Sequence, residues 1–382
     1  MSTEEKEIYE HDIYKYCKEE KDADAVAWAF VNPKKMVKFP FKFPELKPNE
    51  IRANILYSGL CHSDVLTVRS EWGPAKYPIA PGHEMVAEVS LVGSEVKEFK
   101  KGDLVGFGTR RDCCEKCDYC LQGRENLCTD VKDRGTYGHY WGGYSTAIQH
   151  PAKFFYHLPE NFKLNLGSPL FCAGITTYYP MKKFLKEGMK TAVIGIGGLG
   201  HVAIQFLHKL GHKVAAFTTS KDKEELIRKL GGDEIIISTN EEEMKKVKGK
   251  FDFVMNTLPV SENFDKYLCT VAKGGYFVQV GLAPASDFKV TFDYSKLVIN
   301  ELVIVGSCVG PRKTIKEMIQ LCVEKDIYPI VEEFSFEDFP KAFDKLENGK
   351  PKFRCVVNVK DWAEKHGFRN KNPNFQKVKI NI

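Results

Sequence analysis

The sequence predicts an α/β protein of two domains, in which a doubly wound parallel sheet is inserted into a β-rich domain. Three observations lead to this prediction. The chain has 382 residues, more than a single hydrophobic core usually supports. Residues 26–150 alternate short apolar runs with Gly and Pro turns, whereas from about residue 173 strands alternate with helices. We therefore place the first domain at residues 1–172 and 312–382, and the second at residues 173–311.

The first domain is expected to be built from antiparallel strands of modest length. The strand candidates are the apolar runs IRANILYSG, MVAEVSLVGSEV and GDLVGFG, which are separated by turn residues. After the second domain, a helix at residues 314–325 leads to the strand FRCVVNV. We expect this last strand to rejoin the first domain, which makes the second domain an insertion.

The second domain is expected to hold a parallel sheet covered by helices. Helices are predicted at residues 198–211 and 221–232. Buried strands are predicted for TAVIGI, HKVAAFTT, EIIIS, FDFVMNTL, GYFVQVGL and LVIVGSC. Strands that alternate with helices in this way form parallel βαβ units.

Composition and charge exclude several classes of protein. No run of about 18 apolar residues predicts a membrane span. The polar, acidic start resembles neither a secretory signal nor a transit peptide, so we expect a cytoplasmic protein with reduced cysteines. Residues 1–24 carry nine acids against four lysines, and residues 350–382 carry nine Lys and Arg against two acids. The basic end lacks an aromatic stacking pattern, so we expect both ends to be solvated and no nucleic-acid partner.

Four cysteines stand close together at the spacing C-x2-C-x2-C-x7-C. They are Cys114, Cys117, Cys120 and Cys128. In a reduced protein, tetrahedral coordination of Zn²⁺ satisfies four such thiolates together. An iron–sulfur cluster is disfavoured because its bacterial pattern has a shorter last gap and a following proline, whereas Thr129 follows here. Because sulfur fills all four positions, we expect a structural zinc that no substrate can reach.

A glycine-rich turn follows the first predicted strand of the second domain and opens a helix. It consists of Gly195, Ile196, Gly197, Gly198, Leu199 and Gly200. In this context the glycines allow a tight turn and let backbone N–H groups approach a pyrophosphate at the helix N-terminus. The turn therefore predicts a dinucleotide cofactor.

The residues after the next strand favour NADP over NAD. An NAD-binding chain usually has Asp or Glu there, to hold the ribose 2′-hydroxyl. This chain instead has Thr219, Ser220 and Lys223, whose hydroxyl and ammonium groups suit a 2′-phosphate. The one nearby acid, Asp222, falls past the expected place.

Three scattered residues complete a second set of metal ligands. Cys61 lies in GLCHSD, His83 in PGHE and Cys172 in FCAG. Each alone is more typical of a buried core residue, but together they form the Cys2His set of a catalytic zinc with one open position.

The combination of these motifs resembles the zinc-containing medium-chain alcohol dehydrogenases, in particular their cinnamyl alcohol dehydrogenase-like, NADP-dependent branch. The resemblance covers residues 25–360. It includes Cys61 to Asp64, Gly82 to Glu84, the four-cysteine segment, Cys172 to Gly174 and GIGGLGH, in the family's order. It implies a GroES-like catalytic domain with an inserted Rossmann domain, and two Zn²⁺ per chain.

The resemblance also implies a role for each matching residue. Cys61, His83 and Cys172 would bind the catalytic zinc, and Glu84 would approach it during ligand exchange. Asp64 would orient the histidine ligand. Ser63 would relay the alcohol proton, and His62 would lie near the cofactor phosphate or ribose. Thr176 and Ser307 would contact the cofactor. Many relatives end the relay in a histidine where this chain has Leu66.

We therefore expect a hydride-transferring enzyme that uses NADP(H) and a primary alcohol or aldehyde, aromatic or of medium length. Two alternatives remain open from the sequence: an NAD-dependent polyol or secondary-alcohol dehydrogenase, and a non-catalytic scaffold that keeps the fold. The strand LVIVGSC is expected at the edge of its sheet. Relatives pair such a strand across a two-fold axis, so we expect a homodimer.

Overall fold

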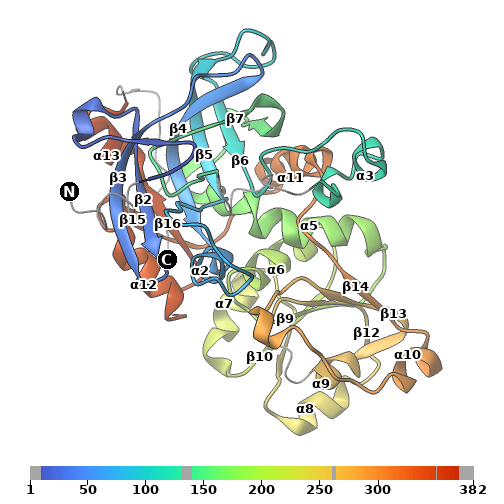
Figure 1. Ribbon diagram of the computed structural model, residues 1–382. Coiled ribbons are helices and arrows are strands. Elements are labelled where there is room, and N and C mark those ends of the chain that lie inside the picture. The colour runs from blue at the N-terminus through green and yellow to red at the C-terminus, as the bar shows by residue number, and fades with distance from the viewer. Residues whose placement is uncertain (1–9, 131–139, 260–263, 350, 370–382) are drawn as a thin grey trace. The chain divides into compact units, whose positions relative to one another are not determined.

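The computed structural model describes residues 10–130, 140–259, 264–349 and 351–369, and it divides the chain into two compact units (Figure 1). The first unit contains residues 1–172, 311–319 and 330–382, and the second contains residues 173–310 and 320–329. Residues 320–329 thus group with the second unit, whereas we expected them in the first domain. One reason is that Gln205, in the second unit, donates a hydrogen bond to the Tyr328 carbonyl at 3.0 Å.

The first unit is β-rich, with two sheets. Its three-stranded sheet has the order β1-β3-β2, and its seven-stranded sheet has the order β15-β16-β4-β5-β6-β8, with β7 also paired to β4. All these neighbours are antiparallel except β15 and β16. The strands are β1 Lys15–Tyr16, β2 Ala25–Asn32, β3 Lys35–Lys42, β4 Glu50–Leu60, β5 Met85–Val92, β6 Leu104–Phe107, β7 Ala147–Pro151, β8 Phe155–His157, β15 Val331–Ser335 and β16 Arg354–Asn358.

Strand β4 is the centre of the larger sheet and delivers the chain to Cys61, one of the predicted metal ligands. It pairs with β5, β7 and β16, so it is covered along both edges. Nine of its eleven residues are buried, including all its aliphatic side chains. The strand β16 contains the run RCVVN and joins this sheet, which confirms that FRCVVNV rejoins the first unit.

Short helices connect and cover these sheets. They are α2 His62–Val68, α3 Asp118–Leu121, α4 Leu164–Gly167, α12 Phe339–Glu347 and α13 Lys360–Lys365. The 3₁₀ turns of this unit are η1 Glu20–Asp22, η2 Glu125–Leu127, η3 Ala152–Phe154 and η4 Ser168–Phe171. Helix α11 Arg312–Lys325 begins in the first unit and ends in the second.

Both charged ends are better packed than we expected. Strand β1 pairs with β3, and the preceding Tyr14 is only 3% exposed. Near the other end, the Arg369 side chain is 1% exposed and forms ion pairs with Glu88 and Glu364. The expectation of solvated ends is therefore wrong for Tyr14, Cys17 and Arg369, which are buried, whereas most charged residues between 10 and 24 are exposed as expected. Residues 1–9 and 370–382 lie outside the described part of the chain.

The second unit has the parallel sheet that the sequence predicts. The strand order is β11-β10-β9-β12-β13-β14, and every pair is parallel. This is the 3-2-1-4-5-6 order of a doubly wound dinucleotide-binding fold. Its strands are β9 Thr191–Ile194, β10 Val214–Thr218, β11 Glu234–Ile237, β12 Phe251–Asn256, β13 Val271–Gln279 and β14 Val303–Gly306. Strand β14, from the run LVIVGSC, lies at the sheet edge as expected.

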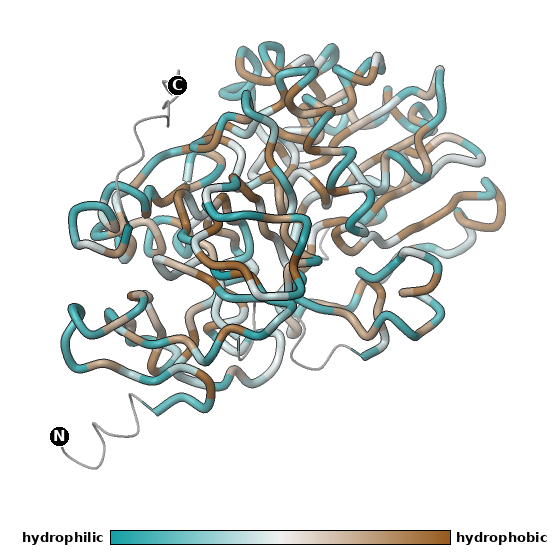
Figure 2. The backbone as a smooth tube through the Cα atoms, turned by 90° about the horizontal axis from the view of Figure 1, so that it is seen from above, coloured by the Kyte–Doolittle hydropathy of each residue, from teal (hydrophilic) through white to brown (hydrophobic). Residues whose placement is uncertain are grey.

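Helices alternate with the strands of this sheet, and the first of them precedes β9. They are α5 Ala173–Phe184, α6 Gly200–Lys209, α7 Glu224–Lys229, α8 Glu241–Lys246, α9 Phe264–Leu268 and α10 Ser295–Asn300, with 3₁₀ turns η5 Lys221–Lys223 and η6 Ala285–Asp287. Hydrophobic and hydrophilic stretches alternate along the chain (Figure 2). All residues of the central strands β9 and β10 are buried, as expected for strands covered on both faces. Among the described residues, no helix is long and apolar enough to cross a membrane.

Candidate active site and structural metal centre

Four potential metal ligands converge in the first unit. They are Cys61, His83, Glu84 and Cys172, and one ligand atom from each lies within 4.8 Å of all the others. Cys61 follows β4, His83 and Glu84 precede β5, and Cys172 follows η4. Neighbouring strands of one sheet thus bring together residues that are far apart in the sequence. The structure confirms that the Cys61, His83 and Cys172 fragments meet.

Cys61 is held where a strand becomes a helix. It is the N-cap of α2, and its backbone N–H donates to Asp64 Oδ2 at 3.3 Å. An acid at the third helical position commonly pairs with the N-cap backbone in this way. The contact between Cys61 and Asp64, which are three residues apart, therefore follows from the way α2 begins.

Asp64 connects this helix to the histidine. Its Oδ1 accepts from His83 Nδ1 at 2.9 Å and from the Gly82 N–H at 3.1 Å. Its Oδ2 accepts from the Tyr144 hydroxyl at 2.9 Å. Because Asp64 and His83 are fully buried, this geometry fixes the ring so that Nε2 is directed away from Asp64.

Glu84 is held by a buried cation. Its Oε1 accepts a hydrogen bond from the Arg354 guanidinium, and the two side chains are 0% and 6% exposed. Its other oxygen, Oε2, is buried and has no hydrogen-bond partner among the described residues. A Cβ on Gly59 would lie 2.1 Å from this oxygen, so glycine is required there.

The electrostatics of the cluster favour a thiolate at Cys61 and a thiol at Cys172. A hydrogen bond from Cys172 holds the pKa of Cys61 well below its usual value, and Arg354 and His83 act in the same direction. The same hydrogen bond, with burial, raises the pKa of Cys172. Burial opposes the protonation of His83, but the charge and hydrogen bond of Asp64 outweigh it and raise the pKa to about 10. Burial raises the pKa of Glu84 to about 7, against the effect of Arg354.

This donor set fits a zinc ion. Two cysteine sulfurs and an oriented imidazole form the three-ligand set of catalytic zinc sites. The orphaned, buried Oε2 of Glu84 is a further oxygen donor within reach of the same point. The histidine already has the carboxylate partner that metal-bound histidines usually have.

A second group of ligands forms the four-cysteine centre. One sulfur from each of Cys114, Cys117, Cys120 and Cys128 lies within 4.8 Å of the others. Backbone N–H groups already point at sulfur: Cys114 N–H donates to Cys128 Sγ at 3.4 Å, and Cys117 N–H donates to Cys114 Sγ at 3.3 Å. Backbone hydrogen bonds, first from Thr129, lower the pKa of Cys117 to about 6. The group is the one that the spacing predicts, and it does not include Cys113.

The glycine turn of the second unit is tight. Gly195 has φ of +82°, and a Cβ on Gly200 would lie 1.9 Å from the Gly195 carbonyl oxygen. Thr257 Oγ1 donates to that carbonyl at 2.7 Å, and His201 Nδ1 contacts the Gly197 carbonyl at 2.8 Å. Helix α6 begins at Gly200 after Leu199, while Gly197 and Gly198 are accessible. The turn thus presents backbone N–H groups at a helix N-terminus.

The residues expected to select NADP surround the end of β10. Thr219 and Ser220 directly follow this strand, and Ser220 Oγ donates to Asp222 Oδ2 at 2.9 Å. Lys223 Nζ donates to the Ile196 carbonyl at 3.0 Å, which places its charge beside the glycine turn. Thr176 lies on α5 and is 8% exposed, and Ser307 directly follows β14.

Comparison with known proteins agrees with this geometry. Residues 47–160 match the alcohol dehydrogenase GroES-like domain, and residues 198–324 match the zinc-binding dehydrogenase domain. The chain is 38% identical to the aldehyde reductase AdhA of Synechocystis sp. over 84% of this chain and 94% of that protein. It is 35% identical to cinnamyl alcohol dehydrogenase 2 of Rauvolfia serpentina over 88% of this chain and 95% of that protein.

Solved structures agree as well. The cinnamyl alcohol dehydrogenase SbCAD4 of Sorghum bicolor superposes with a TM-score of 0.81 at 28% identity, over 88% of this chain and 97% of that one. A CAD of Helicobacter pylori in complex with NADP(H) gives 0.80 at 29% identity, over 88% and 98%. The chain belongs to the zinc-type medium-chain alcohol dehydrogenases. Its fold is therefore a GroES-like domain with an inserted Rossmann domain, as predicted.

Within this dehydrogenase, the proposed relay residues lie on α2. His62 is exposed and Ser63 is half-buried, and the Cys61 thiol contacts Ser63 Oγ at 3.5 Å. Leu66, at the position noted in the sequence analysis as a possible end of the relay, is 3% exposed and packs in the core. The side chain at this position therefore provides packing and no proton-transfer group.

Two residues that contact the site were missed from the sequence. Arg354 pairs with Glu84, and Tyr144 donates to Asp64. A charged residue inside the apolar run FRCVVNV was a signal that Arg354 has a buried partner. The sequence carries no comparable signal for Tyr144, which follows Gly142 and Gly143 outside any predicted strand or helix.

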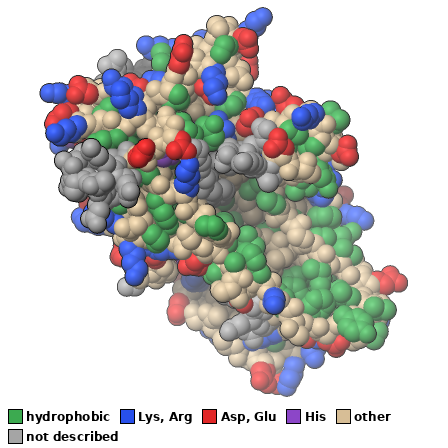
Figure 3. All heavy atoms as spheres, viewed as in Figure 1, with side chains coloured by type: hydrophobic (Ala, Val, Ile, Leu, Met, Phe, Trp, Pro, Cys, Tyr) green, Lys and Arg blue, Asp and Glu red, His purple; other side chains and the backbone are tan. Residues whose placement is uncertain are grey.

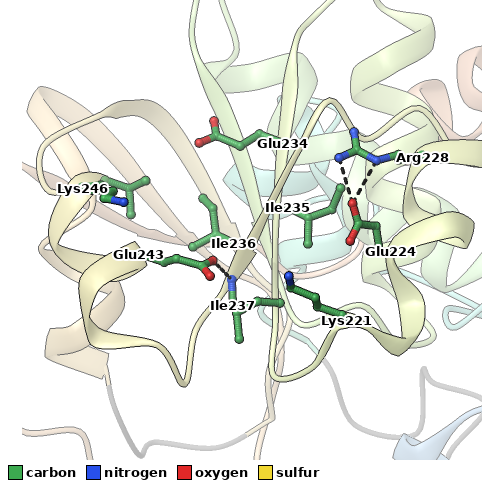
Figure 4. A pocket seen from close by; sticks show the side chains of 10 residues that line it. Lys221, Glu224, Arg228, Glu234, Ile235, Ile236, Ile237, Glu243 and Lys246 are labelled. Atoms are coloured by element: carbon green, nitrogen blue, oxygen red, sulfur yellow. Dashed lines mark hydrogen bonds and ion pairs between the residues drawn. The ribbon is translucent and has the colours of Figure 1, made fainter.

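A pocket of about 310 Å³ lies elsewhere in this dehydrogenase, along the edge strand β11. Figure 4 shows Glu224 paired with Arg228 and Glu243 accepting from the Ile237 N–H. Acidic, basic and isoleucine side chains line it together, and none of our predicted site residues is among them. We assign it no function.

Proposed function

We propose that this protein is an NADP-dependent zinc alcohol dehydrogenase that acts as an aldehyde reductase on aromatic or medium-chain aldehydes. The observation that carries the proposal is the convergence of Cys61, His83, Glu84 and Cys172 around one buried point. A protein that served only as a scaffold would need no three-ligand site with a buried, orphaned carboxylate oxygen beside it. The names of the matched reductases and cinnamyl alcohol dehydrogenases support the substrate class.

The proposed catalytic centre uses Cys61, His83 and Cys172 to hold Zn²⁺. When bound, the metal supplies a Lewis acid for the substrate oxygen. Asp64 holds the tautomer and orientation of His83. Glu84, steadied by Arg354, keeps a carboxylate oxygen close to the ligand atoms for use during exchange of substrate or water.

The proton and the cofactor are handled by other residues. Ser63, beside Cys61, is the hydroxyl that exchanges a proton with the substrate oxygen, and His62 extends the path towards the cofactor or solvent. NADP(H), when bound, supplies the hydride chemistry. The turn at Gly195, Gly197, Gly198, Leu199 and Gly200 holds its pyrophosphate, while Thr176 and Ser307 contact its nicotinamide half.

The preference for NADP rests on Thr219, Ser220 and Lys223. Lys223 lies beside the glycine turn through its bond to the Ile196 carbonyl, and Ser220 begins η5. An ammonium and hydroxyls suit a 2′-phosphate. In support, one similar structure was solved with NADP(H).

Metal analysis combined with turnover tests the central proposal. The parent protein should hold two Zn²⁺ per chain and should oxidise NADPH with an aromatic aldehyde. Cys61→Ser should lose one zinc and all turnover, whereas Cys117→Ser should lose the other zinc. The non-catalytic scaffold would be favoured if the parent showed no turnover and held a single zinc that Cys61→Ser left in place.

The coenzyme proposal needs its own measurement. The parent should prefer NADPH to NADH, and Ser220→Ala with Lys223→Ala should remove that preference without loss of either zinc. Equal use of both coenzymes by the parent would favour the NAD-dependent polyol or secondary-alcohol dehydrogenase instead.

We also propose a homodimer formed through the second unit. On the face of the second unit that Figure 3 shows, hydrophobic side chains gather over α10 and β14. Tyr294, Val298 and Ile299 are 74%, 72% and 73% exposed. The edge strand β14 leaves its outer side unpaired within the described sheet. Edge strands and apolar rows of this kind are usually covered by a partner.

The cysteines support a reducing, cytoplasmic location. All twelve are free thiols in the structure. Six of them are the proposed ligands of the two zinc centres, whose chemistry requires reduced sulfur: Cys61, Cys172, Cys114, Cys117, Cys120 and Cys128.

A further inference from the structure

The amino-terminal segment lies outside the region that resembles the family, yet it contacts a turn that leads to the site. Residues 10–24 precede the region of resemblance, which begins at residue 25, and the family-model match, which begins at residue 47. Strand β1 pairs with Phe41 and Lys42 of β3, and the Cys17 N–H donates to the Pro40 carbonyl at 2.8 Å. These bonds place Tyr14 in the core, with its ring centroid 4.7 Å from that of Trp141.

The Tyr14 hydroxyl fixes the backbone of Trp141. It accepts from the Trp141 N–H at 3.1 Å, and both groups are buried. On the other side, the Trp141 carbonyl contacts His150 Nε2 at 3.2 Å. Arg111 Nε donates to His150 Nδ1, so Nε2 carries the ring proton and donates to Trp141. The peptide groups on either side of Trp141 therefore have defined partners.

The residues after Trp141 form a turn that lies against the segment leading to His83. The Gly142 N–H donates to the Ala80 carbonyl at 2.9 Å, and the Gly143 N–H donates to the Gly82 carbonyl at 3.0 Å. The approach is close, since a Cβ on Gly142 would lie 1.9 Å from the Gly82 oxygen. A displacement of Trp141 would therefore move the backbone that precedes His83.

The turn ends in Tyr144, which reaches the metal ligand through Asp64. The Tyr144 N–H donates to the Pro81 carbonyl at 3.0 Å, and its hydroxyl donates to Asp64 Oδ2 at 2.9 Å. The other oxygen of Asp64 receives His83 Nδ1. One continuous set of buried contacts thus runs from Tyr14 to His83.

We propose that Tyr14 and Tyr144 are positioning residues of the catalytic centre: Tyr14 fixes the turn at residues 141–144, and Tyr144 holds Asp64 against His83. The inference rests on the proposed role of His83 as a zinc ligand. It gives the amino-terminal segment a function, because the segment supplies the hydroxyl on which the turn depends.

The test follows zinc release from the full-length holoprotein to a chromogenic chelator, with turnover measured separately. The variants are Tyr144→Phe and Tyr14→Phe, which keep the rings and remove the hydroxyls. Tyr57→Phe is the matched control, because Tyr57 is also a buried tyrosine of the first unit. Zinc release should have two kinetic phases, one for each centre. The phase that is absent in Cys117→Ser belongs to the four-cysteine centre. Cobalt substitution provides a spectrum of the catalytic site.

Tyr144→Phe should release the catalytic zinc about 10- to 100-fold faster, the range for partners of metal ligands. Tyr14→Phe acts through one more contact and should give an increase of about three- to tenfold. In both variants the cobalt spectrum should shift, while the rate of zinc release from the four-cysteine centre should equal that of the parent. Tyr57→Phe should match the parent throughout.

A parental release rate and cobalt spectrum in Tyr14→Phe would overturn the role of Tyr14, and the same result in Tyr144→Phe would overturn the whole proposal. Equal acceleration of both zinc phases would show general destabilisation and would also overturn it. A parent with two zincs but no turnover would defeat the proposed function alone, since zinc release does not depend on catalysis.

Discussion

At the scale of single residues, the most consequential pair is Glu84 and Arg354. Both are almost completely buried, and they are 270 residues apart in the sequence. A buried carboxylate has a large desolvation cost, which only a close cation and good hydrogen bonds can offset. The pair therefore determines whether the site can keep a carboxylate beside its sulfur ligands.

Arg354→Met should lower the free energy of unfolding by about 3–5 kcal/mol, because it leaves Glu84 buried without its cation. Urea unfolding at neutral pH measures this change. Arg69→Met is the matched control, since its ion pair with Glu347 is 22% and 33% exposed and should contribute about 1 kcal/mol or less. Adding Glu84→Gln to Arg354→Met should restore part of the loss; equal losses for Arg354→Met and Arg69→Met would contradict the argument.

His150 should make stability depend on pH. Burial, and then the charge of Arg111, lower the pKa of this histidine well below its usual value, so it stays neutral in the folded protein. The unfolded chain binds a proton below pH about 6.5 and the folded chain does not, so stability is complete above that pH and falls as the pH decreases. The limiting slope for one group is about 1.4 kcal/mol per pH unit.

His150→Gln should remove this contribution. The Gln side chain can accept from Arg111 and donate to the Trp141 carbonyl, as the neutral imidazole does. The free energy of unfolding should be measured between about pH 7.5 and about pH 5, a range that includes the ordinary histidine pKa. It should fall less steeply with decreasing pH in the variant than in the parent. Identical slopes in parent and variant would show that His150 does not titrate differently on folding.

At the scale of elements, the site depends on close packing between β6 and the segment that carries Cys172. Gly106 lies on β6, and a Cβ there would be 1.7 Å from Phe171 Cζ. Phe171 is fully buried and directly precedes the ligand. The strand and the ligand segment thus share one aromatic contact that leaves no room for a methyl group.

Gly106→Ala should destabilise the protein by about 1–3 kcal/mol, the usual cost of overpacking, and should weaken zinc binding at the Cys172 site. Thermal unfolding and metal content measure the two effects. Gly306→Ala is the control, because a Cβ at Gly306 would meet no atom within 4 Å. If both variants kept the parental melting temperature and two zincs, the packing argument would be refuted.

At the scale of the whole molecule, the exposed apolar row on α10 and β14 predicts the oligomeric state. Val298→Lys with Ile299→Lys places two charges on side chains that are more than two-thirds exposed, so the fold should tolerate them. In the proposed dimer the same charges would be buried without partners. Sedimentation velocity should show a dimer for the parent and a monomer for the double variant.

Leu91→Lys provides the control for this experiment. Leu91 is also an exposed apolar residue, at 46%, but it lies on β5 in the first unit. This variant should remain dimeric. A monomeric parent would remove the dimer proposal, and dissociation by Leu91→Lys would place the interface elsewhere.

Much of the fold was predictable because its determinants are local. The alternation of strands and helices from β9 to β14 repeats within each βαβ unit, so the parallel sheet could be recognised segment by segment. Residues 320–329 were misassigned because helix α11 runs without a break from one unit into the other. Tyr14 was misjudged because charge dominated the composition of its segment, whereas aromatic packing decided its position.

The sequence by itself determined which chemistry this protein can carry: the four-cysteine centre and the glycine turn each lie within one short segment, so spacing alone specifies their geometry. Only the tertiary structure decided which groups support the catalytic ligands. Tyr144 reaches Asp64 across 80 residues, and Arg354 reaches Glu84 across 270. Such partners leave no periodic signal, because sheet pairing between distant strands, and not local spacing, brings their side chains together.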